Sequence, residues 1–429
     1  MQAIVIGAGV IGVSTAWHLR QRGWDVQVIE RHPAAALETS FANAGQISPS
    51  YSAPWANRKA PWLALRWMFD AQAPLLLRPQ WDPRQWKWCL QFLAQCTDAA
   101  FARNFRQIHA LGCFSQQALH EVLQQVPMEY ERLQKGIVHF YPDRQSWEGA
   151  RKLEPFYREL GVDRQFISTE EVLAVEPALA AYRDHIAGGS YSASDETGNA
   201  RLFTQQLAEH CRQQDVQFLW GREVGRLEQE AGVLRRVVLQ GRPDGAPEQV
   251  LRADAVVLAG GVHSPQLLRT VGLDAPIYPG LGYSASFPIL RPEQAPWASV
   301  VEDKRLALSR LGNRLRVAGT VALAGYDRSL DTPVAHLRCQ ALAERVEAIF
   351  PGVCDTRSER EGGHPQYWAG LRPATPSSVP LIGATAIRGL WLNAGHGTLG
   401  WTQGMGSGKA LAQLMSGQTP GIEFPFLQP

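Results

Sequence analysis

A glycine-rich turn directly after an apolar strand constrains the fold of this chain more than any other feature of its sequence. Residues 3–6 have the composition of a buried β-strand, and Gly7, Gly9 and Gly12 follow in the spacing G-x-G-x-x-G. The first glycine allows a tight turn, the second lets the backbone approach a pyrophosphate, and the third allows a helix to pack closely on the strand. We predict that helix over residues 13–22, with its positive dipole end facing the phosphates.

A second strand supports the same interpretation. Residues 25–29 are predicted to form it, and Glu30 follows, 21 positions after Gly9. An acidic residue at about this distance binds a ribose hydroxyl in dinucleotide-binding βαβ units. An ordinary βαβ crossover with glycines in its turn is the alternative. The order of strand, glycines, helix, strand and acid favours a dinucleotide site.

Length and composition indicate a globular protein with two lobes. The chain has 429 residues, more than one core normally supports, and 45% of them are hydrophobic. The formal net charge of +2 gives no reason to expect nucleic acid as a partner. A second glycine-ended apolar strand at residues 253–261 is typical of a chain that returns to a central parallel sheet. We therefore expect a cofactor domain made of separated segments and interrupted by a β-rich lobe.

Cysteine spacing and apolar segment length give no indication of a metal-binding, disulfide-rich, secreted or membrane-spanning protein. No C-x-x-C pair occurs, so the sequence predicts neither a metal site nor a disulfide framework, and reduced thiols in a cytoplasmic protein fit best. The N-terminus lacks the basic residues of a signal peptide, and no apolar run of 18 residues is present that could span a membrane. The six cysteines are Cys89, Cys96, Cys113, Cys211, Cys339 and Cys354.

Tryptophan is concentrated between residues 51 and 88, where six of the fourteen tryptophans lie among arginines and lysines. Aromatic residues beside cations suit a membrane interface or an acidic partner. They equally suit a packed lid over a flat cofactor, which is the interpretation we favour. The tryptophans are Trp55, Trp62, Trp67, Trp81, Trp86 and Trp88, and the cations are Arg58, Lys59, Arg66, Arg78, Arg84 and Lys87.

Four longer segments are more specific than the glycine spacing. They are Thr39-Ser-Phe-Ala-Asn-Ala-Gly-Gln-Ile-Ser-Pro49, Asp195-Glu-Thr-Gly198 with Leu202-Phe-Thr204, Ala369-Gly-Leu-Arg-Pro373, and Gly395-His-Gly-Thr-Leu-Gly-Trp-Thr402. With the glycine fingerprint they closely resemble bacterial FAD-dependent D-amino acid dehydrogenases, within the wider D-amino acid oxidase and glycine oxidase group. The resemblance covers nearly the whole chain in the same order.

The resemblance implies a fold class and a cofactor. The expected fold is α/β, with a Rossmann FAD domain of glutathione-reductase type and an inserted mixed α+β substrate domain. Residues 1–50, 190–275 and 366–429 are assigned to the FAD domain, and residues 51–189 and 276–365 to the substrate domain. The expected cofactor is FAD rather than NAD.

The resemblance also implies roles for individual residues. The fingerprint glycines would hold the pyrophosphate, Glu30 the adenosine ribose and Val224 the adenine, while residues 397–400 would donate N–H groups to the flavin pyrimidine. The implied cofactor-binding residues are Gly7, Gly9, Val10, Ile11, Gly12, Glu30, Arg31, Ser40, Ala44, Gly45, Gln46, Ile47, Val224, Gly260, Gly395, His396, Gly397, Thr398, Leu399 and Gly400. Arg372 would form a bidentate pair with the substrate carboxylate. The other implied catalytic residues are Tyr51, which would close over the substrate, and Tyr283.

The activity implied is oxidative deamination of a D-amino acid. Hydride would pass from Cα to flavin N5, the imine would hydrolyse to a 2-oxo acid and ammonia, and the electrons would go to a quinone or another carrier. One alternative is an oxidase of glycine-oxidase type that uses O₂ and acts on an imino or N-substituted amino acid. Another is a flavin-bearing subunit of an assembly. Peripheral contact of Trp62 and Trp67 with the inner membrane would bring a cytoplasmic chain to a quinone.

Two motifs depart from the family pattern. The family usually has a lysine in Pro-x-Lys-Gly-Tyr-Ser where this chain has Leu281, and Asp-Gly after Thr-Pro where this chain has Ser377 and Ser378. The resemblance places Leu281 at or near the flavin, where a lysine would stabilise superoxide. Leucine there predicts slow reaction with O₂ and favours a dehydrogenase. The departures leave the substrate open between an amino acid, an amine, an imino acid and an N-alkylated amino acid.

Overall fold

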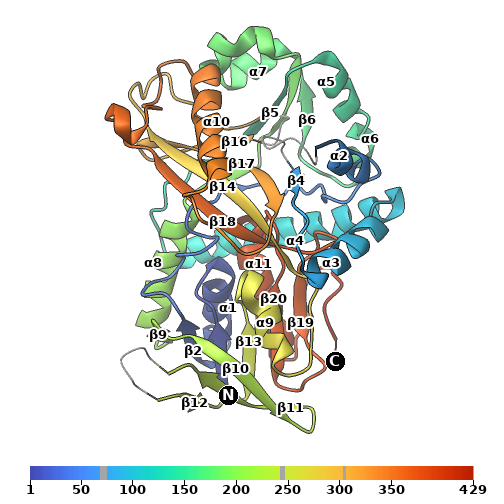
Figure 1. Cartoon of the computed structure of the whole chain (residues 1–429), viewed down its shortest axis with the longest axis vertical. Coiled ribbons are helices and arrows are strands. Elements are labelled where there is room, and N and C mark those ends of the chain that lie inside the picture. Colours follow the sequence, from blue (N-terminus) through green and yellow to red (C-terminus); the bar gives the residue numbers. More distant parts are fainter. Residues whose placement is uncertain (68–74, 242–246, 303–305, 429) are drawn as a thin grey trace.

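A six-stranded sheet forms the centre of the lower lobe in Figure 1. The computed structural model describes residues 1–67, 75–241, 247–302 and 306–428. The strand order is β19-β20-β13-β1-β2-β9, and each neighbouring pair except β19–β20 is parallel. The strands are β1 (Gln2–Ile6), β2 (Asp25–Glu30), β9 (Gln217–Trp220), β13 (Ala255–Leu258), β19 (Leu381–Ala384) and β20 (Leu390–Ala394).

Different layers cover the two faces of this sheet because successive side chains of a strand alternate. In β1, Ala3 and Val5 pack against helices, whereas Ile4 and Ile6 pack against a three-stranded antiparallel sheet. The lobe is therefore a stack of helices, parallel sheet and antiparallel sheet. The helices are α1 (Val10–Arg20), α4 (Asp98–Gln125), α8 (Ala200–Gln213) and α11 (Gly400–Met415), and the antiparallel strands are β10 (Val224–Glu230), β11 (Val233–Leu239) and β12 (Gln249–Leu251).

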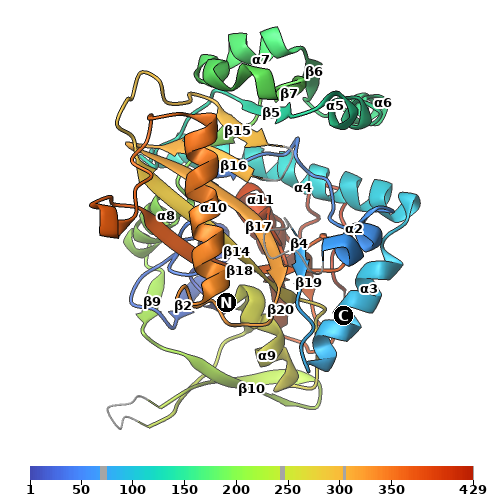
Figure 2. The same ribbon diagram turned by 45° about the horizontal axis from the view of Figure 1, so that its top comes forward.

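A nine-stranded sheet forms the upper lobe, and α10 (Pro333–Ile349) lies along one of its faces, as Figure 2 shows. The strand order is β18-β14-β17-β16-β15-β5-β7-β6, and β4 also pairs with β17. Short runs of alternating polarity at residues 282–287, 306–310 and 314–320 predict antiparallel strands, and they lie in β14, β16 and β17, which pair antiparallel. The bounds are β4 (Leu75–Leu77), β5 (Ile137–Tyr141), β6 (Gln165–Ile167), β7 (Gly188–Ser192), β14 (Tyr278–Pro288), β15 (Ser299–Glu302), β16 (Leu306–Leu311), β17 (Arg314–Leu323) and β18 (Gln366–Ala374).

Short elements connect and flank the two lobes. The strands β3 (Gln46–Ile47) and β8 (Glu196–Thr197) pair with each other. The remaining helices are α2 (Ala60–Trp67), α3 (Pro83–Ala94), α5 (Arg144–Arg151), α6 (Glu154–Glu159), α7 (Thr169–Val175) and α9 (Ser264–Arg269), with 3-10 helices at Pro177–His185, Gly261–His263 and Glu359–Glu361.

Two elements lie across the expected domain boundaries. Strand β18 pairs with β14 along its whole length, so residues 366–374 belong to the upper sheet, although the expected boundary gives them to the FAD domain. Helix α4 packs on α11 and the lower core, although residues 51–189 are assigned to the substrate domain. Both placements have one physical cause: long-range strand pairing and helix packing decide where an element lies, and neither leaves a local signal in the sequence.

Helix α11 contacts α1 and α4 closely because glycines face them. A methyl group on Gly406 would lie 2.6 Å from Cα of Ser115 in α4, and one on Gly408 would lie 2.7 Å from the carbonyl carbon of Ser14 in α1. Both distances are far below normal carbon contacts of about 3.5–4.0 Å. Any side chain larger than a hydrogen atom at these positions would force the helices apart.

Alanine at two helix-interior glycines should therefore change stability in opposite directions. Gly406→Ala should lower the free energy of unfolding by about 2 kcal/mol or more, because the clash with α4 outweighs the gain in helix propensity. Gly149→Ala, in exposed α5 with nothing within 4 Å of the new methyl group, should raise it by about 0.5–1 kcal/mol. Thermal unfolding of both variants tests this pair. A Gly406→Ala protein as stable as the wild type would contradict the packing.

Candidate cofactor and substrate site

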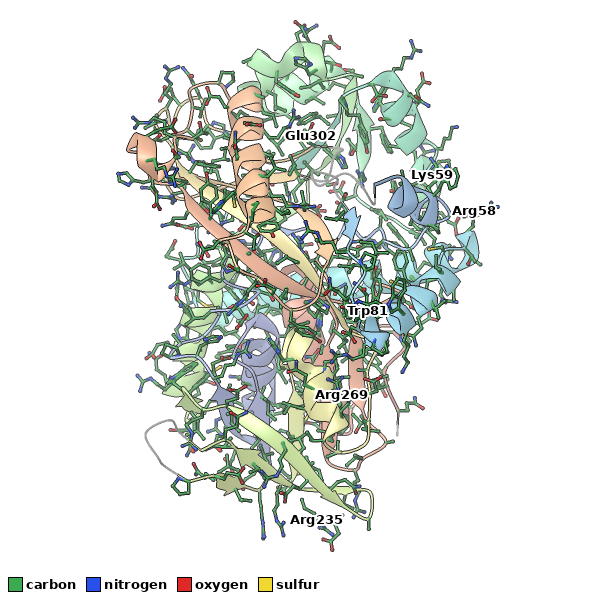
Figure 3. The ribbon with its side chains drawn as sticks, viewed as in Figure 1. Arg58, Lys59, Trp81, Arg235, Arg269 and Glu302 are labelled. Atoms are coloured by element: carbon green, nitrogen blue, oxygen red, sulfur yellow. The ribbon has the colours of Figure 1, made fainter. Side chains whose placement is uncertain are left out.

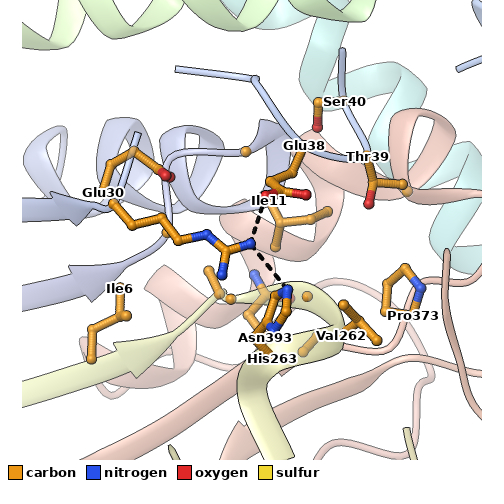
Figure 4. A pocket seen from close by; sticks show the side chains of 18 of the residues that line it. Ile6, Ile11, Glu30, Glu38, Thr39, Ser40, Val262, His263, Pro373 and Asn393 are labelled. Carbon is orange, nitrogen blue, oxygen red and sulfur yellow. Dashed lines mark hydrogen bonds and ion pairs between the residues drawn. The ribbon is translucent and has the colours of Figure 1, made fainter. Parts of the chain in front are cut away.

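A cavity lies at the carboxyl ends of β1, β2 and β13. Strand β1 is flanked by β2 on one side and by β13 on the other, so the strand order reverses here and makes a topological switch point. Ligands of open α/β sheets bind at such a switch point. Figure 4 shows part of the wall, with Ile6 and Glu30 at the ends of two adjacent strands. The predicted cofactor residues that line the cavity are Gly7, Gly9, Val10, Ile11, Glu30, Arg31, Ser40, Val224, Gly260, His396, Gly397, Thr398 and Gly400.

Glycine is needed at the three fingerprint positions for different structural reasons. Gly7 has φ +106°, and a methyl group on it would lie 2.8 Å from the carbonyl oxygen of Ala259. A methyl group on Gly12 would lie 1.8 Å from the carbonyl oxygen of Gly7. The fold itself thus requires both glycines. Gly9 has an ordinary extended backbone, and the nearest atom to an added methyl group is Ser40 Oγ at 3.5 Å, so the protein leaves this space for a ligand.

Glu30 ends β2 with its carboxylate at the cavity. The carboxylate accepts hydrogen bonds from the backbone N–H groups of Ala8, at 2.7 Å, and His32, at 2.9 Å. These two bonds fix its orientation. Each carboxylate oxygen keeps a further lone pair, which can accept a bond from a ribose hydroxyl.

A charged cluster lies beside Glu30 (Figure 4). Arg31 donates to Glu38 at 2.5 Å and lies 3.0 Å from His263 Nε2, while Arg328 from the upper lobe donates to Glu38 at 2.6 Å. Burial acts to raise the pKa of Glu38, but the hydrogen bond to His32 and the charges of Arg31 and Arg328 lower it overall. Glu38 therefore stays ionised and ties the two lobes together at the cavity.

The turn between β20 and α11 forms the opposite wall. Gly395 and Gly397 have φ +87° and +53°, which lets the chain turn sharply into the helix that begins at Gly400. His396 is buried, and burial lowers its pKa to about 3, so its imidazole is neutral at pH 7. Its Nε2 atom has no hydrogen-bond partner among the residues that the structure describes. The helix N-terminus and this polar atom suit an electron-rich ring.

Arg372 of β18 also lines the cavity. Its Nη1 donates to the carbonyl oxygen of Thr320 at 2.9 Å, and its guanidinium fills the space that a methyl group on Gly282 would need. Burial lowers its pKa to about 10, so the group stays positively charged at pH 7. Within the described part of the chain no carboxylate lies within 4.0 Å of it. Arg372 therefore keeps its charge available for an anionic ligand.

Leu281 and Tyr283 lie on the face of β14 opposite to this site. In the antiparallel pairing with β18, Gly280 is level with Arg372, so the intervening residues Leu281 and Tyr283 point the other way. Both pack in the core under α10, where Arg338 lies 5.8 Å from the Tyr283 ring. The expectations that Leu281 lies at the flavin and that Tyr283 is catalytic are therefore corrected. A resemblance in sequence order does not show which face of a strand a side chain occupies.

Several other predicted residues do not line the cavity. Ser48, next to the predicted loop, donates its backbone N–H to Thr402 Oγ1 at 3.1 Å, which ties the loop to the start of α11. Tyr51 contacts the upper lobe, with its ring 5.7 Å from that of His139 and 5.6 Å from the Arg164 guanidinium carbon. The predicted residues outside the cavity wall are Gly12, Ala44, Gly45, Gln46, Ile47, Gly395, Leu399 and Tyr51.

Part of the cavity wall consists of residues that the sequence analysis did not predict. Some of the missed residues could be predicted from the sequence. His263 and its neighbours, for example, directly follow the glycine-ended strand β13, whose carboxyl end is at the switch point. Others, such as Gln240, come to the cavity through tertiary packing alone. The missed lining residues include Glu38, Thr39, Asn43, Arg222, Glu223, Gln240, Val262, His263, Pro373, Asn393 and Trp401.

The cavity fits FAD at both ends. The space at Gly9 and the oriented carboxylate of Glu30 suit a pyrophosphate and a ribose, and the buried His396 Nε2 with the helix start at Gly400 suits the electron-rich flavin pyrimidine. In the described part of the chain no group of His, Cys, Asp and Glu residues could hold a metal ion. Fold and site together define a dinucleotide-binding flavoprotein with a substrate lobe.

Comparison with known proteins supports the assignment as a flavoprotein and identifies the family. The model of the FAD dependent oxidoreductase (DAO) family matches residues 2–414, and the chain belongs to that family. It is 43% identical over 429 residues to the D-amino acid dehydrogenase of Dechloromonas aromatica, with all of both chains covered. It is 38% identical to the D-amino acid dehydrogenase of Agrobacterium fabrum, with 99% of this chain and 97% of that protein covered.

Solved structures share the fold. The glycine oxidase of Geobacillus kaustophilus matches with a TM-score of 0.71 and 20% identity, covering 98% of this chain and 96% of that one. The L-proline dehydrogenase of P. horikoshii matches with a TM-score of 0.71 and 17% identity, covering 98% and 94%. The chain is thus an FAD-dependent oxidoreductase with a Rossmann-type α/β fold.

Alanine at Gly9 and at Gly12 should separate cofactor binding from folding. Gly9→Ala should fold normally but lose most of its FAD, because the methyl group enters space that the protein leaves empty. Gly12→Ala should lose FAD and also unfold at a lower temperature, because its methyl group meets the Gly7 carbonyl. Flavin absorbance per chain and thermal unfolding of the apoproteins measure the two effects. A colourless wild-type protein that binds NAD would contradict the assignment.

Proposed function

We propose that this chain is a D-amino acid dehydrogenase, which converts a D-amino acid to a 2-oxo acid and ammonia and passes the electrons to a quinone or another carrier. The names of relatives that are 38–43% identical over nearly the full length support the reaction class. Arg372 is the observation that carries the proposal, because it places in the cofactor cavity a charged guanidinium that has no carboxylate partner among the residues the structure describes.

Arg372 would bind the substrate carboxylate through two parallel N–H···O bonds. One N–H group of Nη1 is used by Thr320, which leaves Nε and Nη2 with the geometry for a bidentate pair. The pair would fix the carboxylate at one end and leave the Cα–H free to face the cofactor. When bound, FAD supplies the ring that accepts the hydride from Cα. The imine product then hydrolyses in water.

The turn at His396–Gly400 would complete the site. Gly397, Thr398 and Gly400 line the cavity at the start of α11, where backbone N–H groups and the helix dipole favour negative charge. The neutral His396 ring adds a polar atom without adding charge. Positioning and electrostatic stabilisation are therefore the contributions we assign to the protein.

The stereochemistry of the substrate and the role of Arg372 can be tested together. D-Alanine should bleach the oxidised-flavin absorbance of the wild type under anaerobic conditions, and L-alanine should not. Arg372→Lys should raise the KM for D-alanine about 30-fold or more with FAD still bound, because an ammonium group cannot form the bidentate pair. Arg235→Lys is the matched control, since Arg235 lies on β11 at the far end of the lower lobe (Figure 3) and should leave KM unchanged.

The outcomes distinguish the competing functions. Rapid reduction of an artificial dye with slow oxygen uptake supports the dehydrogenase. Rapid oxygen uptake with peroxide formation would instead indicate an oxidase of glycine-oxidase type. An isolated chain that binds FAD but turns over no amino acid, imino acid or amine would contradict the proposal and favour a subunit of an assembly.

We further propose that an exposed aromatic surface on α2 and α3, which we call the tryptophan surface, contacts the inner face of a membrane. Trp62, Trp81 and Trp86 are exposed, and Leu90 and Leu93 continue the exposed side of α3 at helical spacing. Trp55 and Trp88 instead pack at the end of β18, and neither lines the cofactor cavity. The side chain of Trp67 lies outside the described residues.

Charge complementarity supports an anionic lipid surface as the partner. Residues 55–94 contain six cations and two carboxylates, a net charge of +4, whereas the whole chain has +2. Figure 3 shows Arg58 and Lys59 near α2 and Trp81 near the start of α3. Tryptophans with neighbouring cations bind the headgroup region of a bilayer. Among the described residues no helix is long and apolar enough to cross a membrane.

Vesicle flotation tests the tryptophan surface. The wild type should float with vesicles that contain phosphatidylglycerol at low salt and less so at high salt, where the electrostatic attraction is screened. Trp81→Glu combined with Trp86→Glu should abolish flotation, whereas Trp297→Glu should not, although Trp297 is also exposed and has a cation, Arg310, over its ring. Equal flotation of all three proteins would contradict this interface.

A further inference from the structure

Strand β17 contains a bulge beside the site. Leu281 and Tyr283 of β14 pair with Ala322 and Gly319 of β17, so the single residue between the first two is matched by two residues, Thr320 and Val321, between the second two. On its other edge, β17 pairs with β16 as far as Ala318 and with β4 from Val321. Thr320 therefore lies where the pairing on both sides of β17 changes. An extra residue in a strand locally re-aims the backbone groups.

Thr320 has a backbone conformation that its side chain disfavours. Its φ is +55°, and a β-branched residue in this left-handed region is a genuine outlier. Such outliers persist where the surrounding structure imposes them, and they concentrate at functional sites. In this conformation the carbonyl oxygen of Thr320 accepts the 2.9 Å hydrogen bond from Arg372 Nη1.

The chemistry of this partner suits a substrate-binding cation. A carboxylate beside Arg372 would neutralise the guanidinium and compete with a substrate carboxylate. A backbone carbonyl orients the group and leaves its positive charge intact. Gly282 lies against the guanidinium, so the group is confined by β14 and hydrogen-bonded by β17.

We propose that Thr320 is a positioning residue: its carbonyl, re-aimed by the β17 bulge, sets the plane of the Arg372 guanidinium for the substrate carboxylate. This inference rests on the proposed role of Arg372. Thr320 belongs to none of the sequence motifs and does not line the cavity wall, so its role follows from the β17 bulge and from the hydrogen bond to Arg372.

Proline and glycine at position 320 test the carbonyl. Thr320→Pro cannot adopt a φ of +55°, so the carbonyl must move, and the KM for D-alanine should rise about tenfold with a much smaller change in kcat. Thr320→Gly accepts this φ freely and should keep KM within about threefold of the wild type. Ala231→Pro, which removes another positive φ of +49° in the distant turn between β10 and β11, controls for a general loss of stability.

A double-mutant cycle shows whether the effect passes through Arg372. In an Arg372→Ala background, Thr320→Pro should cause no further rise in KM. If Thr320→Pro does not fold, replacement of Val321 by its α-hydroxy acid weakens the Thr320 carbonyl as an acceptor, and the same rise is expected.

The outcomes separate the two proposals. An unchanged KM in Thr320→Pro, or an equal rise in the Arg372→Ala background, would overturn the positioning role. An Arg372→Ala protein with the KM of the wild type would instead refute the substrate-binding role of Arg372 on which this inference rests.

Discussion

Close backbone contact around the first glycine turn is the constraint on which the rest of this structure depends. Gly12 brings α1 against the turn at Gly7, and Gly408 brings α11 against α1. These contacts place the start of a helix from the N-terminal end of the chain beside the start of a helix from the C-terminal end. The two helix N-termini face one cavity, so the anion-binding groups of both can serve one dinucleotide.

Hydrogen bonds between the lobes complete that cavity. Thr39 donates through its hydroxyl to the carbonyl oxygen of Leu371 at 2.9 Å, and Ser284 donates to that of Ala42 at 2.7 Å. The loop after β2 is thus fixed to strands β14 and β18 of the upper sheet. Because of this connection, Arg372, which belongs to the upper sheet, lines a cavity whose other walls belong to the lower lobe.

Arg372 also illustrates how a buried charge can remain useful. Burial of an unpaired ion is unfavourable, and its pKa falls to about 10 as a result. A pKa of about 10 still keeps the guanidinium protonated at pH 7. The Thr320 carbonyl accepts one of its N–H groups without cancelling the charge. An ion pair at this position would be more stable but would have less capacity to bind an anion.

The sequence by itself determined the local elements of the cofactor site. The strand, the glycines and Glu30 are close in sequence, and each has a local physical reason, so their arrangement was predictable. The resemblance to a family, spread over several motifs, added FAD and Arg372. The upper sheet was predicted in part, because alternating polarity indicates strands but not their partners.

Only the tertiary structure decided which faces and which neighbours these elements use. The same two-residue period that puts Gly282 under Arg372 puts Leu281 and Tyr283 under α10, and a motif matched by position cannot show that difference. The bulge at Thr320 likewise depends on where β17 changes partners. Register and strand pairing are long-range properties, set by packing and hydrogen bonding between segments that are distant in the chain, and so they follow from the folded structure and not from local sequence.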